Sequence, residues 1–427
     1  MPAKRRVLIV TGSYAPAMIA DMHRVRQLAW HLPALGWDVD IFCPDESYQP
    51  RACLDHDSAA FFADTPIRHV PARMEWLFRA LGVGSIGIRA VLPALSEGSK
   101  LIRQGRYDLV YFSTAQFMLF LLGPAWRRRF AVPYVLDLHD PLHAPDSGAG
   151  LKQRMSRMLS AVVEASAVKA AAGLISVSPR YLDDLRRDYA GSKPAWLAAD
   201  RHAVIPFAVR PEDLAEAARS APPRRADATA KIVYVGTGGP IMRRSFDLLC
   251  RAIAHLRAQG SDLPDRVRIE LHGTASALGG DMAPHLAGIA REHGFDDIVS
   301  ENPSRVTYRR SLELLLHGDG ALILGVDDAG YMPSKLFTYA YSGKPVLASL
   351  HRDSPALALL RQRPELGHAV WFGGDEEMPI AEGARIVGAF LTEVAERRQF
   401  DRQSVLAPYS AAAMARRHAE LFEACLE

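Results

Sequence analysis

The sequence has few cysteines and no long apolar run, and its positive and negative charges nearly balance. Its four cysteines, Cys43, Cys53, Cys250 and Cys425, form no C-x-x-C pair, so neither a zinc ribbon nor a disulfide framework is expected. No segment reaches the roughly 18 consecutive apolar residues that a membrane-spanning helix needs. A formal net charge of +3 is too small to indicate nucleic acid as a partner.

The first twenty residues lack two further signals. The basic residues 4–6 precede an apolar run that covers only residues 7–10, which is too short for the apolar region of an export signal. We therefore expect a cytoplasmic protein with reduced thiols. Gly12 is the only glycine of this stretch, so the G-x-G-x-x-G fingerprint is missing and a dinucleotide-dependent dehydrogenase is disfavoured.

The composition predicts a globular protein of two α/β domains. The chain has 427 residues, of which 49% are hydrophobic and 23% charged, and this length is large for a single core. Short apolar runs alternate with segments of helical periodicity, which is typical of βαβ units in doubly wound parallel sheets. We expect one Rossmann-like domain at residues 1–210, a second at 211–404 and a last helix at about 405–427. The Pro- and Arg-rich segment 220–229 is the expected linker.

The first βαβ unit has the clearest pattern in the N-terminal half. Strands are predicted at 7–10 and 39–43, with a helix at 21–35 between them. Residues 61–104 are less regular, because apolar side chains are interleaved with arginines. Two interpretations are open for this region: a helical insertion packed on the first domain, or a surface that contacts an anionic membrane. The arginines 127–129 are expected to be a solvated helix end.

The most informative stretch is residues 330–349, GYMPSKLFTYAYSGKPVLAS. Pro333 suits the first turn of a helix, and Gly343 suits the position just past a helix end. The apolar runs at 321–324 and 346–348 are predicted strands. The loop and helix start would then lie where open α/β sheets bind ligands, and free N–H groups there favour an anion such as a diphosphate. Lys335 adds a positive charge, although a solvated lysine on an ordinary helix is an equal alternative.

The pattern P-S-K-L-F-x-Y-x-x-S-G-K-P-V-L-A in this stretch resembles the donor-side signature of the large, retaining, nucleotide-sugar-dependent family of GT-B glycosyltransferases (group 1, family 4-like). The resemblance implies the GT-B fold, in which two Rossmann-like doubly wound domains face an interdomain cleft and the last helix crosses back onto the first domain. It implies transfer of a sugar from a nucleoside diphosphate sugar to a hydroxyl of a saccharide or lipid-linked acceptor, in polysaccharide, glycolipid or other glycoconjugate synthesis. Neither a cofactor nor a metal is implied. Peripheral contact with the inner face of the cytoplasmic membrane belongs to the same expectation.

A second group of polar residues follows the strand predicted at 133–138. His139 and His143 are four residues apart, but Pro141 between them breaks the helical face that a zinc pair would need. In the resembling family this loop faces the transferred sugar, which makes His139 and Asp140 expected catalytic residues. A hydrogen-bonded pair within the loop, without a catalytic role, is the equal alternative.

The resemblance assigns the remaining roles by matching motifs. A basic pair of the family, which neutralises the departing diphosphate, corresponds to Arg244 and to Thr237, where Arg243 could compensate for the missing charge. The expected catalytic residues are His139, Asp140 and Arg244. The expected donor-binding residues are Gly236, Gly238, Arg243, Arg244, Asn302, Tyr331, Met332, Pro333, Ser334, Lys335 and Thr338. The expected acceptor-binding residues are Tyr14, Asp21 and Met22.

Departures from the family's pattern keep two other functions open. Two glutamates of the family, eight positions apart, correspond to Gly330 and Thr338, and Asp327 or Asp328 could supply a carboxylate instead. A nucleotide-sugar 2-epimerase of the same fold would need paired carboxylates near the sugar and would turn over without an acceptor. A non-catalytic GT-B subunit, which binds a partner glycosyltransferase or the membrane, would bind no nucleotide.

Overall fold

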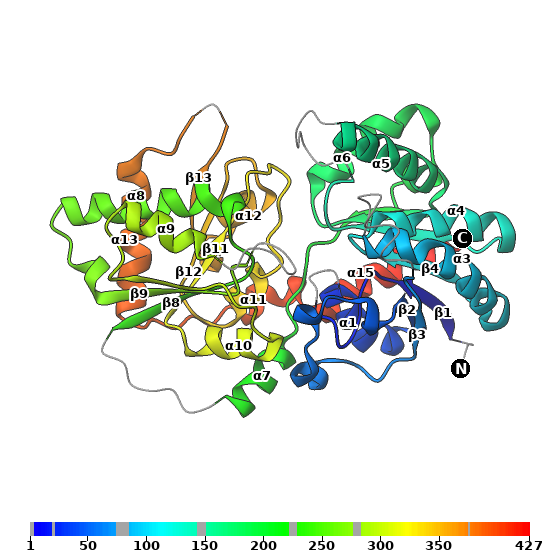
Figure 1. The fold of residues 1–427 in the computed structure, drawn as a ribbon, viewed down its shortest axis with the longest axis horizontal. Helices are drawn as coiled ribbons and strands as arrows, with labels where there is room; N and C mark the ends of the chain where they lie inside the picture. Colours follow the sequence, from blue (N-terminus) through cyan, green and yellow to red (C-terminus); the bar gives the residue numbers. More distant parts are fainter. Residues whose placement is uncertain are drawn as a thin grey trace. The chain divides into compact units, whose positions relative to one another are not determined.

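The computed structural model describes residues 4–18, 22–73, 85–142, 151–221, 229–275, 283–374 and 376–427. The chain forms two compact units, Met1–Pro206 with Ala411–Glu427 and Phe207–Ser410. Each unit is built on one parallel β-sheet with helices packed against it (Figure 1), which confirms the expected pair of Rossmann-like α/β domains. The expected linker falls largely outside the described residues. No helix within the described residues is long and apolar enough to cross a bilayer.

The first unit contains a sheet of seven strands in the order β3-β2-β1-β4-β5-β6-β7. The strands are β1 (Arg5–Val10), β2 (Trp37–Pro44), β3 (Ile67–Val70), β4 (Leu109–Ser113), β5 (Tyr134–Leu138), β6 (Gly173–Ser176) and β7 (His202–Val204). All neighbours are parallel, and Val7 of β1 is in register with Val39 on one side and Leu109 on the other. The strand order reverses between β1 and β4, which is the topological switch point of a doubly wound sheet.

The helices of this unit follow the predicted alternation. They are α1 (Met22–His31), α3 (Ile86–Gly105), α4 (Leu122–Phe130), α5 (Leu151–Ala170), α6 (Pro179–Tyr189) and α15 (Ala411–Ala424). The helix expected at 21–35 is divided into α1 and a 3₁₀ turn, Leu32–Leu35, because Pro33 cannot donate an α-helical hydrogen bond. Gly36 closes the turn at φ +87°, as its position after the apolar stripe indicates.

The described residues of segment 61–104 form a strand and a helix of the first unit. β3 is the edge strand, and α3 is the crossover that leads to β4. Ala90, Ala94 and Ile102 bury one face of α3 in the core. A helix packed on the first domain is therefore confirmed, although it is a connection of the sheet and not an insertion. Residues 74–84, which carry much of the apolar and arginine pattern, lie outside the described residues.

The second unit contains a sheet of six parallel strands in the order β10-β9-β8-β11-β12-β13. The strands are β8 (Ala230–Val235), β9 (Val267–His272), β10 (Val299–Asn302), β11 (Gly320–Leu324), β12 (Val346–His351) and β13 (His368–Phe372). The helices are α7 (Pro211–Ser220), α8 (Arg243–Ala258), α9 (His285–Glu292), α10 (Tyr308–His317), α11 (Leu336–Tyr341), α12 (Pro355–Gln362), α13 (Ile380–Ala395) and α14 (Gln403–Leu406).

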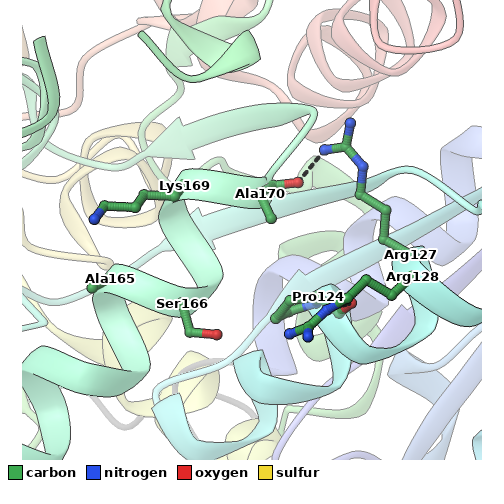
Figure 2. Close-up of a pocket in the computed structure, with 7 residues that line it drawn as sticks. All are labelled: Pro124, Arg127, Arg128, Ala165, Ser166, Lys169 and Ala170. Carbon is green, nitrogen blue, oxygen red and sulfur yellow. Dashed lines mark hydrogen bonds between the residues drawn. The ribbon is translucent and has the colours of Figure 1, made fainter. Parts of the chain in front are cut away.

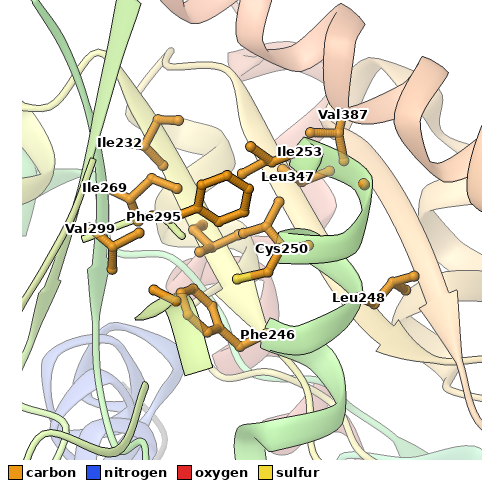
Figure 3. Packing of buried hydrophobic residues seen from close by; sticks show 14 of the residues in the cluster. Ile232, Phe246, Leu248, Cys250, Ile253, Ile269, Phe295, Val299, Leu347 and Val387 are labelled. Carbon is orange, nitrogen blue, oxygen red and sulfur yellow. The ribbon is translucent and has the colours of Figure 1, made fainter. Parts of the chain in front are cut away.

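The core of the second unit lies between its sheet and helix α8. Phe246, Cys250 and Ile253 of α8 point towards the strands, where they meet Ile232 and Ile269 (Figure 3). These side chains are between 0% and 1% exposed, and burial of this kind is the main favourable term in folding. The packing fixes the start of α8, and with it Arg243 and Arg244, next to the carboxyl ends of the strands.

Candidate functional site

The carboxyl ends of β8 and β11 form the switch point of the second sheet. β8 pairs with β9 on one side and with β11 on the other, so the chain leaves these two central strands in opposite directions. Such a point leaves room at the strand ends where ligands of open α/β sheets bind. The loop after β8, residues 236–239, and the loop after β11, residues 325–335, both begin here.

Lys335 reaches back from the second of these loops to the end of β8. Its Nζ donates a hydrogen bond to the carbonyl of Val235. A Cβ at position 236 would collide with this ammonium group, so the lysine can adopt this position only because residue 236 is glycine. The residue as a whole is partly exposed, and burial of its ammonium group, followed by the positive charge of Arg305, lowers the pKa of Lys335 to about 8. The alternative of a solvated lysine on an ordinary helix does not describe this geometry.

Tyrosine side chains hold the strand end against which Lys335 lies. The hydroxyl of Tyr339 lies 3.3 Å from both the nitrogen and the carbonyl oxygen of Val235. The hydroxyl of Tyr234 donates to the carbonyl of Thr237 in the following loop. Burial raises the pKa of both tyrosines, so both hydroxyls keep their protons and act as donors at neutral pH. These bonds give the loop a fixed path past Lys335.

Gly238 lies in the same loop with little room around it. Its N–H donates to the carbonyl of Thr274 at 3.1 Å, and a Cβ here would come within 2.8 Å of the Thr274 Cβ. Asn302 lies farther along this edge, at the end of β10. Its side-chain oxygen accepts from the N–H of Ser304 at 3.1 Å, so its carboxamide shapes the turn that follows the strand.

Arg243 and Arg244 turn towards different neighbours although they are adjacent in sequence. Arg244 binds Asp327, in the loop after β11, at 2.7 Å, and its guanidinium lies 5.8 Å from the centre of the Phe372 ring. Arg243 binds Glu292 of α9 at 2.7 Å. Arg244 therefore stands beside the strand ends, whereas Arg243 extends along the helical layer. Both ion pairs are about half exposed.

The helix predicted to begin at Pro333 begins later. Residues 331–335 form a loop and turn, and α11 covers only Leu336–Tyr341 with Lys335 as its N-cap. The carbonyl of Tyr331 accepts a hydrogen bond from the Ser354 hydroxyl at 2.8 Å, so contacts outside the segment set its path. The predicted helix start at Pro333 is wrong, and the free N–H groups expected there do not form a helix end.

The other expected donor residues of this segment lie around that loop. Met332 is buried, Pro333 is buried, and Ser334 and Thr338 are partly exposed. Asp328, considered as a substitute carboxylate, accepts from the N–H of Gly330 at 2.7 Å and so shapes the loop. Asp327 is engaged by Arg244. The structure thus brings Lys335, Arg244, Gly236 and Gly238 to one sheet edge.

The first unit has a buried polar network at the ends of β4 and β5. The carboxylate of Asp137 is fully buried, and its Oδ2 lies 2.6 Å from the Tyr111 hydroxyl, 3.1 Å from the Ser113 hydroxyl, 2.9 Å from His139 Nε2 and 3.1 Å from Arg24 Nε. Burial by itself would raise the pKa of Asp137, but Arg24 and then His139 outweigh burial and hold the pKa well below its usual value. The network therefore contains a permanent carboxylate at neutral pH.

His139, an expected catalytic residue, belongs to this network. Its Nε2 lies 2.9 Å from Asp137 and 3.1 Å from the Ser113 hydroxyl, and its side chain is only 4% exposed. Asp140, the next residue, is exposed. His139 is therefore oriented by a carboxylate two residues earlier in the chain.

Arg24 and His418 complete the network from two distant helices. Arg24 of α1 donates to the carbonyl of Ile205 at 2.7 Å, and its Nη1 lies 3.4 Å from Nε2 of His418 in α15. His418 Nδ1 lies 2.8 Å from the carbonyl of Met414. Neither residue was among the expected site residues. Arg24 could have been suspected from the sequence, because it is a charged residue on the apolar face of the helix predicted at 21–35. Sequence spacing gives no indication that His418 belongs to this network.

Among the expected acceptor residues, Tyr14 and Met22 lie in the interior of the first unit. Met22 begins α1 and is fully buried. Tyr14 is 3% exposed, and its ring packs edge-on against Phe62 at 5.3 Å between centroids. Burial raises the pKa of its hydroxyl. Asp21 lies outside the described residues. Across the ranges that the structure describes, no group of three His, Cys, Asp or Glu side chains is arranged to hold a metal ion.

Neutral His418 predicts how the first unit responds to acid. Burial, followed by the positive charge of Arg24, lowers the pKa of His418 to about 3. Because an unfolded histidine titrates near pH 6.5, the unfolded chain binds more protons than the folded chain between about pH 6.5 and 3. Stability is therefore complete above this window and is lost as the pH falls through it, by at most about 1.4 kcal/mol per pH unit.

Urea unfolding at pH 7 and pH 5 checks this expectation. We expect the His418→Gln variant to lose less stability between the two pH values than the unchanged protein. His56 is exposed, so the matched variant His56→Gln keeps the original pH dependence. An unchanged pH dependence in His418→Gln would contradict the assignment.

Comparisons with known proteins agree with this architecture. Residues 23–207 match the family model described as the glycosyl transferase 4-like domain, whereas no curated protein matches the chain in sequence. The Anabaena protein Alr3699/HepE in complex with UDP-glucose is 15% identical, with a TM-score of 0.61 over 97% of this chain and 98% of that chain. The catalytic domain of starch synthase IV from Arabidopsis thaliana, bound to ADP and acarbose, is 11% identical, with a TM-score of 0.60 over 99% of both chains. The expected GT-B fold is thereby confirmed.

The GT-B architecture also includes enzymes of another class. A putative UDP-N-acetylglucosamine 2-epimerase from Listeria monocytogenes is 12% identical, with a TM-score of 0.51 over 97% of this chain and 94% of that chain. At this identity the likeness concerns the fold alone. The choice between transferase and epimerase therefore depends on the chemistry of the sites.

Proposed function

We propose that this chain, whose residues 23–207 match the glycosyl transferase 4-like domain, is a glycosyltransferase that moves a sugar from a nucleoside diphosphate sugar to a hydroxyl acceptor. The observation that carries the proposal is the position of Lys335, whose ammonium group lies at the switch point of the second sheet beside Gly236. UDP-glucose and ADP, named with two of the similar structures, share a nucleoside diphosphate. We assign a group of this kind to the same sheet edge here.

In this proposal the second unit stabilises the leaving group. As the bond between the anomeric carbon and the diphosphate oxygen breaks, negative charge develops on the diphosphate, and Lys335 and Arg244 are two cations at this edge. Fixed charges that lie next to the charge that develops in the transition state usually make the largest contribution to catalysis. The exposed ion pair between Arg244 and Asp327 is weak, so Arg244 can exchange this partner for a phosphate at little cost.

The first unit is proposed to supply the acceptor contacts. His139 and Asp140 follow β5, and Asp137 orients the His139 ring. The acceptor oxygen forms the new bond to the anomeric carbon, and its proton leaves with the diphosphate. Retention of the anomeric configuration, through front-face attack assisted by the leaving phosphate, is part of the proposal and is taken from the family resemblance. A cytoplasmic location and an acceptor in glycoconjugate synthesis are further parts of it.

A thermal-shift screen with UDP, GDP, ADP and TDP tests the donor assignment. A ligand at about 100 times its dissociation constant stabilises the folded state by about 2.7 kcal/mol. We expect one diphosphate to raise the melting temperature and the Arg244→Ala variant to reduce the shift. Arg251→Ala is the matched control, because Arg251 lies in the same helix, α8, and forms an exposed ion pair with Glu377.

The same preparations separate the two other functions. Interconversion of a nucleotide sugar in the absence of any acceptor would show an epimerase. Failure of every nucleotide to stabilise the protein would favour a non-catalytic subunit. If the diphosphate raises the melting temperature of the unchanged protein and of Arg244→Ala equally, Arg244 does not bind the donor. Lys335 would then be the proposed ligand of the diphosphate.

A further inference from the structure

The outer face of α5 in the first unit carries apolar side chains that the unit does not cover. Met158 is 71% exposed, Val162 65% and Leu159 41%. With 3.6 residues per turn, these positions share one side of the helix with Arg154 before them and with Ser166 and Lys169 after them. We call these six residues the α5 face. An exposed apolar group of this kind on a helix indicates a binding surface.

The opposite side of α5 is firmly attached to the sheet. Val163 and Ala167 are buried in the core. The Tyr134 hydroxyl donates to the carbonyl of Ala167 at 2.6 Å, and the Trp196 indole donates to the carbonyl of Val168 at 2.9 Å. The orientation of α5 about its axis is therefore fixed. Met158 and Val162 cannot be buried in the core of this unit by rotation of the helix.

A basic hollow of about 560 Å³ lies at the end of the α5 face, between α4 and α5. Its polar lining comes from Arg127 and Arg128 of α4 and from Ser166 and Lys169 of α5. Figure 2 shows Arg128 turned towards Ser166, with Arg127 bound to the carbonyl of Ala170 and Lys169 extending outwards from the rim.

The charge of this basic hollow is not neutralised within the unit. In the part of the chain that the structure describes, no carboxylate forms an ion pair with Arg127, Arg128 or Lys169, and none lines the hollow; the two arginines donate to the carbonyls of Ala170 and Pro124. Some other surface arginines of this protein do have such partners, for example Arg186 with Asp183 and Arg187 with Asp184 on α6. Three cations around a hollow without a carboxylate favour an anionic ligand such as a phosphate.

The two features together fit an amphiphilic partner. Cations stand at both ends of the α5 face, Arg154 and Lys169, about 22 Å apart along the helix, and apolar side chains lie between them. Long basic side chains can direct their charges to lipid headgroups while neighbouring apolar side chains enter the boundary with the acyl chains. A soluble anion would use the basic hollow but gives no role to Met158, Leu159 and Val162.

We propose that the α5 face and the basic hollow form a surface that binds a membrane leaflet containing anionic phospholipids. A lipid phosphate occupies the basic hollow, and Met158, Leu159 and Val162 enter the headgroup region. Membrane contact was expected from the family resemblance without a location, and this inference assigns it to named residues on α4 and α5; it depends on no step of sugar transfer. It also differs from the expectation that residues 61–104 contact the membrane, since the carrying residues belong to α4 and α5.

Flotation of the full-length protein with vesicles tests this surface. We expect binding to vesicles of phosphatidylcholine with phosphatidylglycerol, little binding to phosphatidylcholine alone, and weaker binding at higher salt. A cation near an anionic leaflet contributes about 1 kcal/mol, so the double variant Arg128→Gln with Lys169→Gln is expected to bind about 25-fold more weakly. Met158→Gln with Val162→Gln is expected to weaken binding as well, without changing its salt dependence.

Two controls are matched to these variants. Arg361→Gln with Arg385→Gln removes the same charge from α12 and α13 of the second unit, where both arginines are exposed. Leu35→Gln changes a leucine that is 36% exposed and lies outside the α5 face. We expect both control proteins to bind as the unchanged protein does, and the melting temperature of each variant verifies that it is folded.

Several outcomes would overturn the proposal. Absence of binding to anionic vesicles would do so directly, as would equal binding by Arg128→Gln with Lys169→Gln. If soluble glycerol phosphate stabilises the protein through Arg128 and Lys169 while vesicles do not bind, the basic hollow is a site for a soluble phosphate and the membrane assignment is wrong. Because nucleotide binding is measured separately, the outcome does not depend on that of the proposed function.

Discussion

Replacing Asp137 with alanine is expected to lower the free energy of unfolding of the first unit by about 3–5 kcal/mol, the usual cost of leaving a buried charge without its partner. Arg24 would lose its carboxylate while remaining fully buried, since its side chain is 0% exposed. Tyr111, Ser113 and His139 would lose the shared acceptor at the same time. Urea unfolding of the full chain, followed by the emission of its tryptophans, measures the change.

The matched control for this substitution is Asp38→Ala. Asp38 pairs with Lys4 at 3.4 Å, and both side chains are more than half exposed, so the expected loss is at most about 1 kcal/mol. Asp137→Asn keeps the size of the side chain but replaces one acceptor oxygen with an NH2 donor and removes the charge. If Asp137→Ala unfolds at the same urea concentration as Asp38→Ala, the buried network does not stabilise the unit as its geometry indicates.

Lys335→Met is expected to reduce the turnover of a nucleotide sugar by about 10²–10³-fold, the usual effect of removing one group that stabilises developing negative charge.

The pH dependence of kcat/KM tests the charge of Lys335 in a second way. Because the pKa of Lys335 is lowered to about 8, its charge is present below that pH and is lost above it. We therefore expect kcat/KM to fall as the pH rises through 8, and Lys335→Arg, which keeps its charge, to move that decline to higher pH.

The pH dependence of the free energy of unfolding shows whether Lys335→Met loses turnover because the charge is gone or because the protein unfolds. An unfolded lysine has a pKa near 10.4, so between about pH 8 and 10.4 the unfolded chain binds more protons than the folded chain. The free energy of unfolding therefore rises with pH across this window, because the folded state no longer holds an enclosed charge. Lys335→Met is expected to remove this rise without lowering the melting temperature at pH 7. Unchanged turnover in a folded Lys335→Met protein would remove Lys335 from the donor site.

Local patterns in the sequence predict most of the fold. The apolar runs at 7–10, 133–138, 231–235 and 321–324 are strands of the two sheets, because buried parallel strands need continuous apolar residues. Gly343 adopts φ +76° just past α11, as expected of the glycine that ends a helix. These features depend on neighbouring residues alone, so spacing and residue type suffice to predict them.

The beginning of α11 shows where local pattern fails. Pro333 has the properties of a first helical residue, yet the helix starts at Leu336. The hydroxyl of Ser354, from a later segment, donates a hydrogen bond to the Tyr331 carbonyl. The ammonium group of Lys335 donates to a carbonyl at the end of β8, which lies about a hundred residues earlier in the chain. Contacts between distant segments determine this loop, and these contacts leave no periodic signal around residue 333.

The sequence by itself determined the two α/β domains, the alternation of strands and helices, and the place of the stretch that contains Lys335 after a strand of the second sheet. Only the tertiary structure decided that Lys335 lies against Gly236 and that Arg243 and Arg244 bind carboxylates in different segments. It also decided that Arg24 and His418 lie close to each other near Asp137. Secondary structure follows from the order of residues along the chain, because its hydrogen bonds and apolar faces repeat over a few positions. The sites depend on which strand ends become neighbours, and that is decided when the sheets assemble.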